Sequence, residues 1–311
     1  MNAPSSRSVP LRDWLHAFRL RTLPLAVSSI LVGGAVAYKT LDREGSGPFD
    51  PVVLVLALLT AILLQVLSNL ANDLGDHQHG TDGPDRIGPQ RAVQSGAIPP
   101  ATMKRAMVVC GLLAFICGTV LVHRALGMGI WGLLFLFVGT LAILAAIKYT
   151  FGASPYGYAG LGDISVFLFF GLVGVLGTFF LFTERLAPPL LPAIALGLLS
   201  TGVLHTNNMR DVDNDAANGK RTMAVRLGRR NARLYHALLV LGALACLLVF
   251  TWQQPGTPWK WLFLPTLVLP MVHLRNVLRT HDPALLDPEL KRSALGTFVI
   301  SVMFSFAHVI S

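Results

Sequence analysis

Apolar residues occur along this chain in nine blocks, separated by short polar stretches. Each block is about 20 residues long, which is the length that a helix needs to cross the hydrocarbon core of a bilayer. The pattern therefore predicts an all-α, polytopic membrane protein with nine transmembrane helices. The predicted spans are residues 22–38, 51–70, 104–122, 128–147, 163–183, 189–208, 233–252, 258–277 and 293–310. Too little chain is left over for a sizeable soluble domain, so residues 1–311 are predicted to form one membrane domain.

Residues 1–21 precede the first apolar block and are polar and basic. They lack the apolar core of a signal peptide. Trp14, Leu15 and Phe18, together with neighbouring arginines, suit a short helix that lies at the membrane surface. A solvated tail is the alternative interpretation.

The composition agrees with a membrane protein, because 53% of the residues are hydrophobic and only 13% are charged. Soluble domains carry about 25% charged residues. The three cysteines, Cys110, Cys117 and Cys246, fall inside predicted spans and form no CxxC pair. We interpret them as small core residues and not as disulfides or metal ligands.

The net charge of +9 could indicate nucleic-acid binding, but its distribution favours a membrane origin. Loops on one predicted side, with the N-terminus, hold 20 of the 25 Lys and Arg residues, and the other side holds 5. Positive residues concentrate on the cytoplasmic side of membrane proteins. The distribution predicts a cytoplasmic N-terminus and, after nine crossings, an external C-terminus, with no nucleic-acid partner.

Two acidic motifs follow the second and sixth spans, both on the basic side. Asn69, Asn72, Asp76 and Gly80 are spaced by 3, 4 and 4 residues. The second motif repeats these steps with Asn208, Asp211, Asp215 and Gly219. Such steps place side chains on one helix face, and the glycine then ends the helix. The match suggests an internal repeat four spans apart.

Carboxylates at a helix C-terminus are opposed by the helix dipole and repel one another. A divalent cation relieves both problems, and Mg²⁺ prefers oxygen ligands. Basic residues that lie near the acids in the sequence, or that open another loop on the same side, could neutralise the remaining charge of a diphosphate. These residues are Arg86, Arg91, Lys148, Lys220 and Arg221. A diphosphate attached to a long lipid would explain a site at the end of a membrane helix.

Other interpretations of these motifs remain open. The acids could belong to ordinary solvated loops, and His77 and His79 are more typical of polar surface than of a metal site. A cation-coupled transporter would also carry intramembrane acids. Transporter acids, however, lie near the bilayer midplane, whereas these lie at helix ends beside basic loops.

The motifs "NDLGD" and "DVDND" resemble the paired NDxxD and DxxxD motifs of the UbiA superfamily of intramembrane prenyltransferases. The resemblance covers nearly the whole chain. It is closest to the branch that prenylates 1,4-dihydroxy-2-naphthoate in menaquinone synthesis. The stretches that carry it are "FRLRTLPLAVSSILVGGA", "NDLGDHQHGTDGPDRIGPQRAVQSG", "KYTFGASPYGYAGLGDISVFLFFG" and "NNMRDVDNDAANGKRTMAVRLG". Many members have a further Asp where this chain has Gly80, and the next acid in this chain is Asp82.

The resemblance implies a helical bundle around a central cavity that is open to lipid, with Mg²⁺ as the cofactor. The implied metal ligands are Asn72, Asp76, Asp211 and Asp215. The implied catalytic residues are Asp76, Asp211, Asp215, Lys148 and Tyr149. The substrate-binding residues are taken to be Arg21, Arg86, Arg91, Asp163, Asn208, Lys220 and Arg221.

Some of these residues also have simpler explanations. Lys148 and Tyr149 could be an interfacial anchor pair. Asp163 also suits a helix N-terminus. We interpret His205, one turn before Asn208, as a buried polar residue and not as a catalytic base.

The implied partners are a polyprenyl diphosphate, an aromatic acid and the bilayer, with no obligatory protein partner. The implied reaction joins the prenyl group to the naphthoate with loss of CO₂, at the cytoplasmic face of a bacterial inner membrane. Other acceptors, such as 4-hydroxybenzoate or homogentisate, remain the alternative within the superfamily.

Overall fold

The computed structural model describes residues 9–81 and 87–311, and this part of the chain is helical, without strands. Nine of its helical segments are long and apolar enough to cross a membrane, as the hydrophobic pattern predicts. The chain is therefore an integral, multi-pass membrane protein. The segments are α2 (Leu23–Glu44), α3 (Pro51–Gln78), α4 (Pro100–Leu126), α5 (Ile130–Lys148), α6–η3–α7 (Gly162–Thr183), α8 (Leu190–Arg210), α10 (Met223–Gln253), η4–η5–α11 (Pro258–Arg279) and η6–α12 (Pro283–Ile310).

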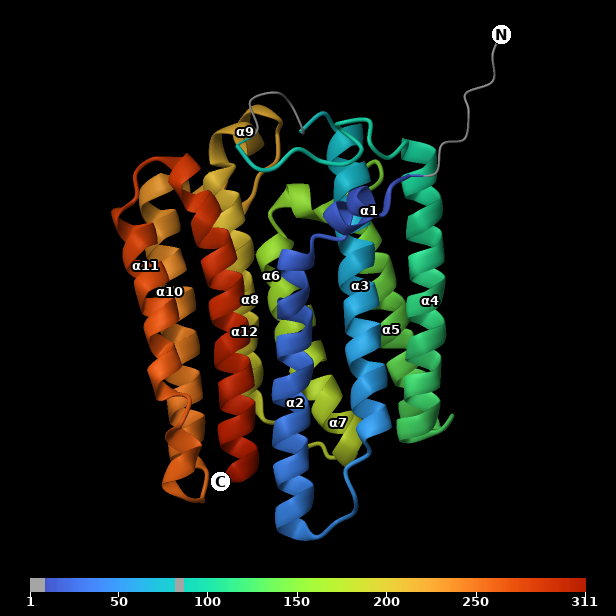
Figure 1. Cartoon of the computed structure of the whole chain (residues 1–311), viewed down its shortest axis with the longest axis vertical. Coiled ribbons are helices and arrows are strands. Elements are labelled where there is room, and N and C mark those ends of the chain that lie inside the picture. Colours follow the sequence, from blue (N-terminus) through green and yellow to red (C-terminus); the bar gives the residue numbers. More distant parts are fainter. Residues whose placement is uncertain (1–8, 82–86) are drawn as a thin grey trace.

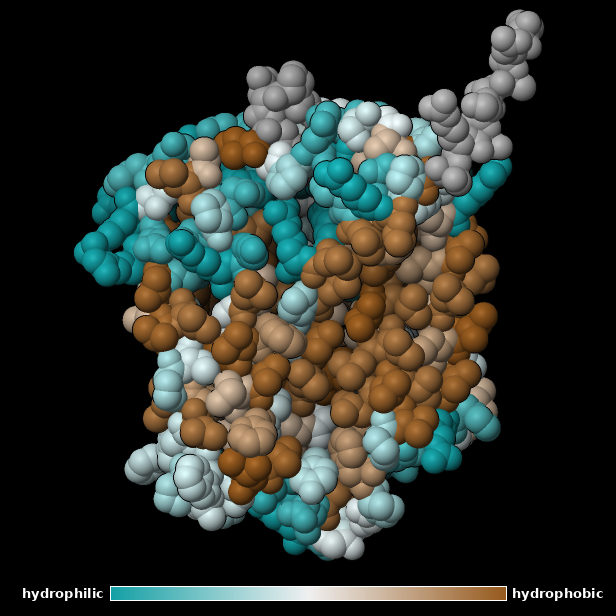
Figure 2. Space-filling view, in the orientation of Figure 1, coloured by the Kyte–Doolittle hydropathy of each residue, from teal (hydrophilic) through white to brown (hydrophobic). Residues whose placement is uncertain are grey.

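The helices stand side by side and form one bundle (Figure 1). α3 packs against α4, α8 against α10, and α12 against α2. The helical start of the chain and the end of α12 lie at opposite ends of the bundle, as an odd number of crossings requires. Figure 2 shows, on the face in view, a broad apolar belt across the middle of the molecule and a polar band at the upper end. The belt is the surface that faces lipid.

The polar end is built from short elements and loops. α1 (Leu11–Ala17) and η1 (Leu20–Thr22) precede α2, and Trp14 and Phe18 pack against the apolar cluster around Leu70. The predicted helix before the first span is thus present. η2 (Tyr156–Ala159) and α9 (Val212–Ala217) lie in the loops after α5 and α8.

Two predicted spans are less regular than the sequence indicates. The fifth contains a π-helical stretch, η3 (Phe167–Gly177), between two short α-helices. A Cβ on Gly174 would lie 2.7 Å from the Cβ of Ser29, so this stretch approaches α2 closely because it lacks side chains there. The eighth span begins with the 3₁₀ turns η4 (Pro258–Trp261) and η5 (Leu264–Leu267), and α11 (Val268–Arg279) starts only after them.

The second acidic motif departs from its predicted geometry. The common spacing predicts a continuous helical face through Asn208, Asp211 and Asp215. The structure instead ends α8 at Arg210 and starts α9 at Val212, with Asp211 between them. The prediction of a continuous helical face was therefore wrong for this motif. For the first motif it is correct, because α3 continues to Gln78 and carries Asn69, Asn72 and Asp76. Gly80 and Gly219 both have positive φ, 70° and 72°, and both follow the helix end, as predicted.

Candidate active site

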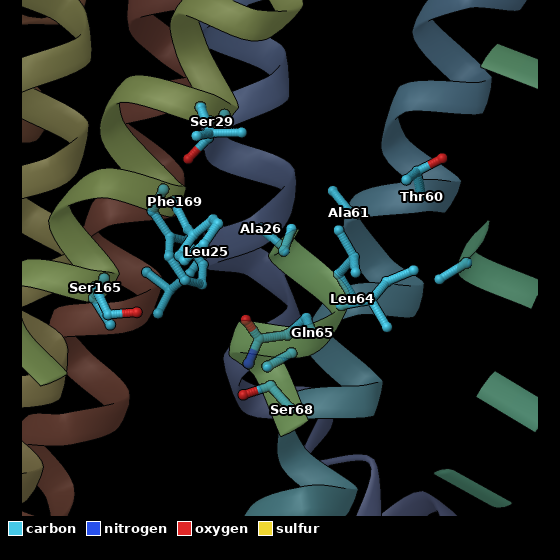
Figure 3. A pocket seen from close by; sticks show the side chains of 18 of the residues that line it. Leu25, Ala26, Ser29, Thr60, Ala61, Leu64, Gln65, Ser68, Ser165 and Phe169 are labelled. Carbon is cyan, nitrogen blue, oxygen red and sulfur yellow. The ribbon is translucent and has the colours of Figure 1, made fainter. Parts of the chain in front are cut away.

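A cavity of about 620 Å³ opens among α2, α3, α4, α5, the η3 segment and α8. Most of its wall is apolar. Figure 3 shows α2 contributing Leu25, Ala26 and Ser29 opposite Ala61 and Leu64 of α3, with Phe169 from η3 beside them. A long apolar chain fits such a wall. Where the cavity reaches the polar end of the bundle, its lining changes to amides and charged side chains.

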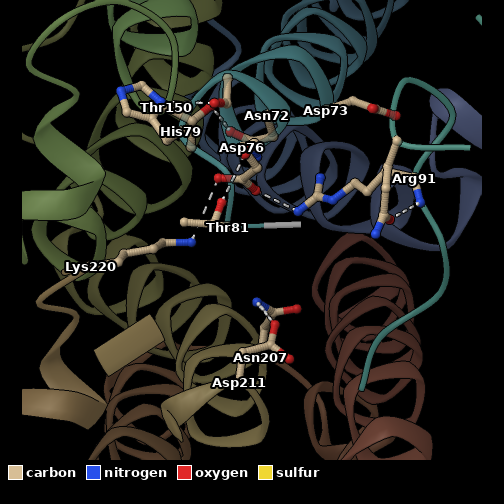
Figure 4. Close-up of polar contacts among 12 residues, drawn as sticks. Asn72, Asp73, Asp76, His79, Thr81, Arg91, Thr150, Asn207, Asp211 and Lys220 are labelled. Atoms are coloured by element: carbon tan, nitrogen blue, oxygen red, sulfur yellow. Dashed lines mark hydrogen bonds and ion pairs between the residues drawn. The ribbon is translucent and has the colours of Figure 1, made fainter. Parts of the chain in front are cut away.

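Asp76 is the centre of this polar end. Its carboxylate is buried and accepts hydrogen bonds from Nη2 of Arg91 at 2.6 Å and from the hydroxyl of Tyr158 at 2.9 Å. The ammonium of Lys220 lies 3.9 Å from its Oδ1 atom. Figure 4 draws Asp76 between Arg91 and Lys220. Burying a carboxylate is costly unless it is paired and hydrogen-bonded in this way.

Asn72 lies one turn before Asp76 on α3 and also lines the cavity. Its side-chain oxygen accepts a hydrogen bond from Thr150 at 2.8 Å. Asp73, between them, points elsewhere: its two oxygens accept the backbone N–H groups of Ala92 and Val93 at 3.1 and 3.0 Å. Asp73 therefore fixes the loop that places Arg91 beside Asp76.

Asp215 of the second motif contacts the same ammonium as Asp76. Its Oδ1 atom lies 3.6 Å from the ammonium of Lys220, and its buried Oδ2 atom has no hydrogen-bond partner among the residues that the structure describes. Burial raises the pKa of Asp215 to about 6, Asp211 and Asp76 add to the rise, and Lys220 opposes it. One ammonium thus stands between carboxylates from both halves of the protein.

Asp211 is held differently. Arg210 is fully buried and donates from Nε and Nη2 to the two oxygens of Asp211, at 2.8 and 2.7 Å. A third donor, Nη1, reaches Asp287 at the start of α12, at 2.6 Å. Asp211 does not line the cavity, although it remains close enough to Asp215 to raise its pKa.

The structure brings most of the predicted site residues to one end of the cavity. Seven of them line it: Arg21, Asn72, Asp76, Arg91, Tyr149, Asn208 and Lys220. Asp211 and Asp215 are buried beside it. Lys148 and Arg221 are exposed outside the lining, and Arg86 falls outside the described residues.

Asp163 is also outside the cavity lining, at the start of its helix. Its Oδ2 atom lies 3.5 Å from Nδ1 of His205, and both residues are buried. His205 is fully buried, as the sequence interpretation expected.

Sequence reasoning missed Tyr158 and Arg210, and it named Asn69 without identifying its role. Tyr158 lies in the stretch "SPYGYAG", whose letters do not show that its hydroxyl reaches Asp76 from 82 positions away. Arg210 directly precedes Asp211 in the sequence, so their order could have suggested that the two side chains pair. Asn69 belongs to the spaced motif, but it donates to the backbone oxygen of Phe18 and to Thr22, at 2.9 and 3.1 Å, and thereby fixes the segment that carries Arg21.

A divalent cation fits the oxygen-rich character of this end. Mg²⁺ uses one or two carboxylates together with waters and substrate phosphates, so it does not need an all-protein cage. Among the described residues no three His, Cys, Asp or Glu side chains converge on one point. Two features mark the place where a cation is favoured: the buried Oδ2 of Asp215, for which residues 9–81 and 87–311 supply no hydrogen-bond partner, and the ammonium already shared by Asp76 and Asp215.

A sequence model of the UbiA prenyltransferase family matches residues 26–287. The 1,4-dihydroxy-2-naphthoate octaprenyltransferase of Escherichia coli (strain K12) is 47% identical over 292 residues, which cover 94% of this chain and 93% of that protein. The protein of the same name from Haemophilus influenzae is 43% identical over 305 residues, with 96% of each chain covered.

Solved structures share the fold at much lower sequence identity. An apo UbiA homolog from Aeropyrum pernix K1 gives a TM-score of 0.69 at 14% identity and covers 94% of this chain and 98% of its own. A UbiA homolog from Archaeoglobus fulgidus, solved with GPP and Mg²⁺, gives 0.63 at 14% identity, with 96% and 100% covered. At this identity the likeness establishes a common arrangement of helices.

Proposed function

Because this chain belongs to the UbiA prenyltransferase family, we propose that it transfers a polyprenyl group from a polyprenyl diphosphate to 1,4-dihydroxy-2-naphthoate, with loss of CO₂. The observation that carries the proposal is the cavity itself, which joins a long apolar wall to a polar end with carboxylates and cations from both halves of the chain. The name of the relatives that are 43–47% identical over nearly the full length supports this acceptor.

The two ends of the cavity would bind the two ends of the donor. The apolar wall formed by α2, α3, α5 and η3 takes up the prenyl chain and removes its surface from water. Arg21, Arg91 and Lys220 line the polar end and favour the negative charge of a diphosphate. The diphosphate then lies at the same depth as the ends of α3 and α8.

Mg²⁺ would be held by Asp76 and Asp215, with Asn72 and Asp211 close by. When bound, it neutralises charge that builds up on the diphosphate as the allylic C–O bond breaks. The structure of the Archaeoglobus fulgidus homolog with GPP and Mg²⁺ supports this cofactor. Arg91 and Tyr158 already fix the carboxylate of Asp76, so this ligand is held in place before substrates bind.

The side chains have two further tasks. The apolar wall excludes water, which would otherwise capture the allylic cation. The cationic end attracts the carboxylate of the acceptor as well as the diphosphate. The ring of a dihydroxynaphthoate is electron-rich, so it attacks the cation without activation by a side-chain nucleophile. Loss of CO₂ from the attacked carbon restores the aromatic ring, and no side chain has to remove a ring proton.

The distribution of positive charge supports a cytoplasmic site. The end of the bundle that carries α1, α9 and both acidic motifs is also the one with most of the Lys and Arg residues. In a bacterium this corresponds to the inner membrane, with the active site toward the cytoplasm.

The test is an assay with purified protein, a polyprenyl diphosphate and one acceptor at a time. We expect lipid product from 1,4-dihydroxy-2-naphthoate, together with one equivalent of labelled CO₂ from its carboxylate. Product from 4-hydroxybenzoate alone would assign the chain to another branch. A naphthoate product that keeps its carboxylate would overturn the decarboxylating chemistry.

A further inference from the structure

Lys220 occupies an unusual position between the two acidic motifs. Its ammonium lies 3.9 Å from Oδ1 of Asp76 and 3.6 Å from Oδ1 of Asp215, and both carboxyl side chains are at most 5% exposed. The two acids come from α3 and α9, in different halves of the chain. Lys220 is therefore the counter-ion that connects the two halves at the polar end of the cavity.

The surrounding backbone fixes where the lysine starts. Gly219 has a φ of 72°, and the N–H of Lys220 donates to the carbonyl of Asp215 at 2.8 Å. The next residue, Arg221, donates its N–H to the carbonyl of Tyr158 at 2.9 Å. The ammonium also lies 5.2 Å from the centre of the Tyr158 ring. The base of the side chain is thus held, while its flexible four-carbon stem can carry the charge to another partner.

A divalent cation held by Asp76 and Asp215 would neutralise the same two carboxylates that Lys220 now contacts. Two cations so close together repel each other strongly at a buried site. The lysine and the metal ion are therefore alternatives at this position.

We propose that Lys220 is an exchangeable counter-ion: it holds Asp76 and Asp215 together, and it moves onto the diphosphate when metal and donor bind. This inference rests on the proposed metal and diphosphate chemistry. The exchange predicts that removing the charge of Lys220 has opposite effects on two binding affinities. Metal alone should bind more tightly without Lys220, whereas the complex of metal and diphosphate should bind less tightly.

The experiment measures Mn²⁺ binding to the purified full-length protein by electron paramagnetic resonance, first without diphosphate. Lys220→Met should bind Mn²⁺ at least about tenfold more tightly than the wild type, equivalent to about 1.4 kcal/mol. With a non-hydrolysable prenyl diphosphate analogue added, the same variant should bind the analogue at least about tenfold more weakly. Lys220→Arg keeps the charge and covers the case in which Lys220→Met does not fold.

Arg230→Met is the matched control, because it removes one positive charge from an exposed side chain in the same region. Its Mn²⁺ affinity should stay within about twofold of the wild type, since solvent screens exposed charges. Unchanged or weaker Mn²⁺ binding by Lys220→Met, with normal binding by the wild type, would overturn the exchange. If Lys220→Met does not fold, Lys220→Arg decides the question instead. Because this variant keeps the positive charge, Mn²⁺ binding tenfold tighter than that of the wild type would also overturn the exchange. Absence of Mn²⁺ binding in the wild type, with and without the analogue, would instead overturn the proposed metal chemistry.

Discussion

Arg210 donates to both carboxylate oxygens of Asp211, the residue that follows it in the chain, at distances of 2.8 and 2.7 Å. The guanidinium is completely buried, and its third donor reaches Asp287 on α12. A bidentate pair of this kind fixes the carboxylate in one orientation. Because the pair lies where α8 gives way to α9, it also fixes the break between these helices and ties it to α12.

Replacing Arg210 with Met should destabilise the protein by about 3–5 kcal/mol, because a buried carboxylate then loses its cation. Thermal unfolding in detergent would measure the loss. Arg229→Met is the control, since Arg229 pairs with Asp213 on the surface, where such pairs contribute about 0–1 kcal/mol. If Arg210→Met unfolded at the wild-type temperature, the pair would have no stabilising role.

Asp76→Asn and Asp215→Asn should each lower kcat/KM by at least about a hundredfold, which corresponds to about 2.7 kcal/mol of transition-state stabilisation. Both changes preserve side-chain volume and remove one ligand charge. Chelation of divalent cations by EDTA should likewise stop turnover, and added Mg²⁺ should restore it. Asp213→Asn, at an exposed residue of the same short helix, should change kcat/KM less than twofold. Full turnover in EDTA, or an active Asp215→Asn enzyme, would contradict the assigned metal site.

Gly75→Ala should impair folding although alanine favours helices. A Cβ at Gly75 would lie 2.5 Å from the carbonyl oxygen of Thr150, so α3 would have to move away from the segment after α5. That segment supplies Thr150 to Asn72 and Tyr158 to Asp76, and both contacts depend on the close approach. We expect lower yield of folded protein and a lower unfolding temperature.

Gly111→Ala on α4 is the comparison for this variant, because its Cβ would meet only ordinary contacts at 3.8–3.9 Å. Its stability should be equal to the wild type or higher, since alanine reduces the freedom of the unfolded chain. Equal stability of the two variants would show that the contact between α3 and Thr150 is not tight in solution.

A reporter fused after Ser311 should be active only on the external side of the membrane. The reason is the unequal distribution of Lys and Arg together with nine crossings among the described residues. The same reporter inserted into the loop between α8 and α10 should be active only in the cytoplasm. A C-terminal reporter active only in the cytoplasm would exclude this topology.

The sequence by itself determined the membrane spans and the two polar helix ends. The spans are local properties, since any apolar stretch of about 20 residues must form a helix in a bilayer to satisfy its own backbone. The first motif was also local: Asn69, Asn72 and Asp76 lie on one continuous helix, and their spacing alone places them on one face. The basic loops near the acids were visible in the order of residues.

Only the tertiary structure decided which of these groups meet. It turned Asp211 toward Arg210 instead of the cavity, brought Tyr158 and Arg91 to Asp76, and placed Lys220 between Asp76 and Asp215. It also placed Lys148 and Arg221 outside the cavity. These outcomes depend on how helices from distant parts of the chain pack, and on which buried charges find a partner. Side-chain spacing gives the face of one helix, but the partner of a buried charge is set by the free energy of the whole packed arrangement, to which residues far away in the sequence contribute.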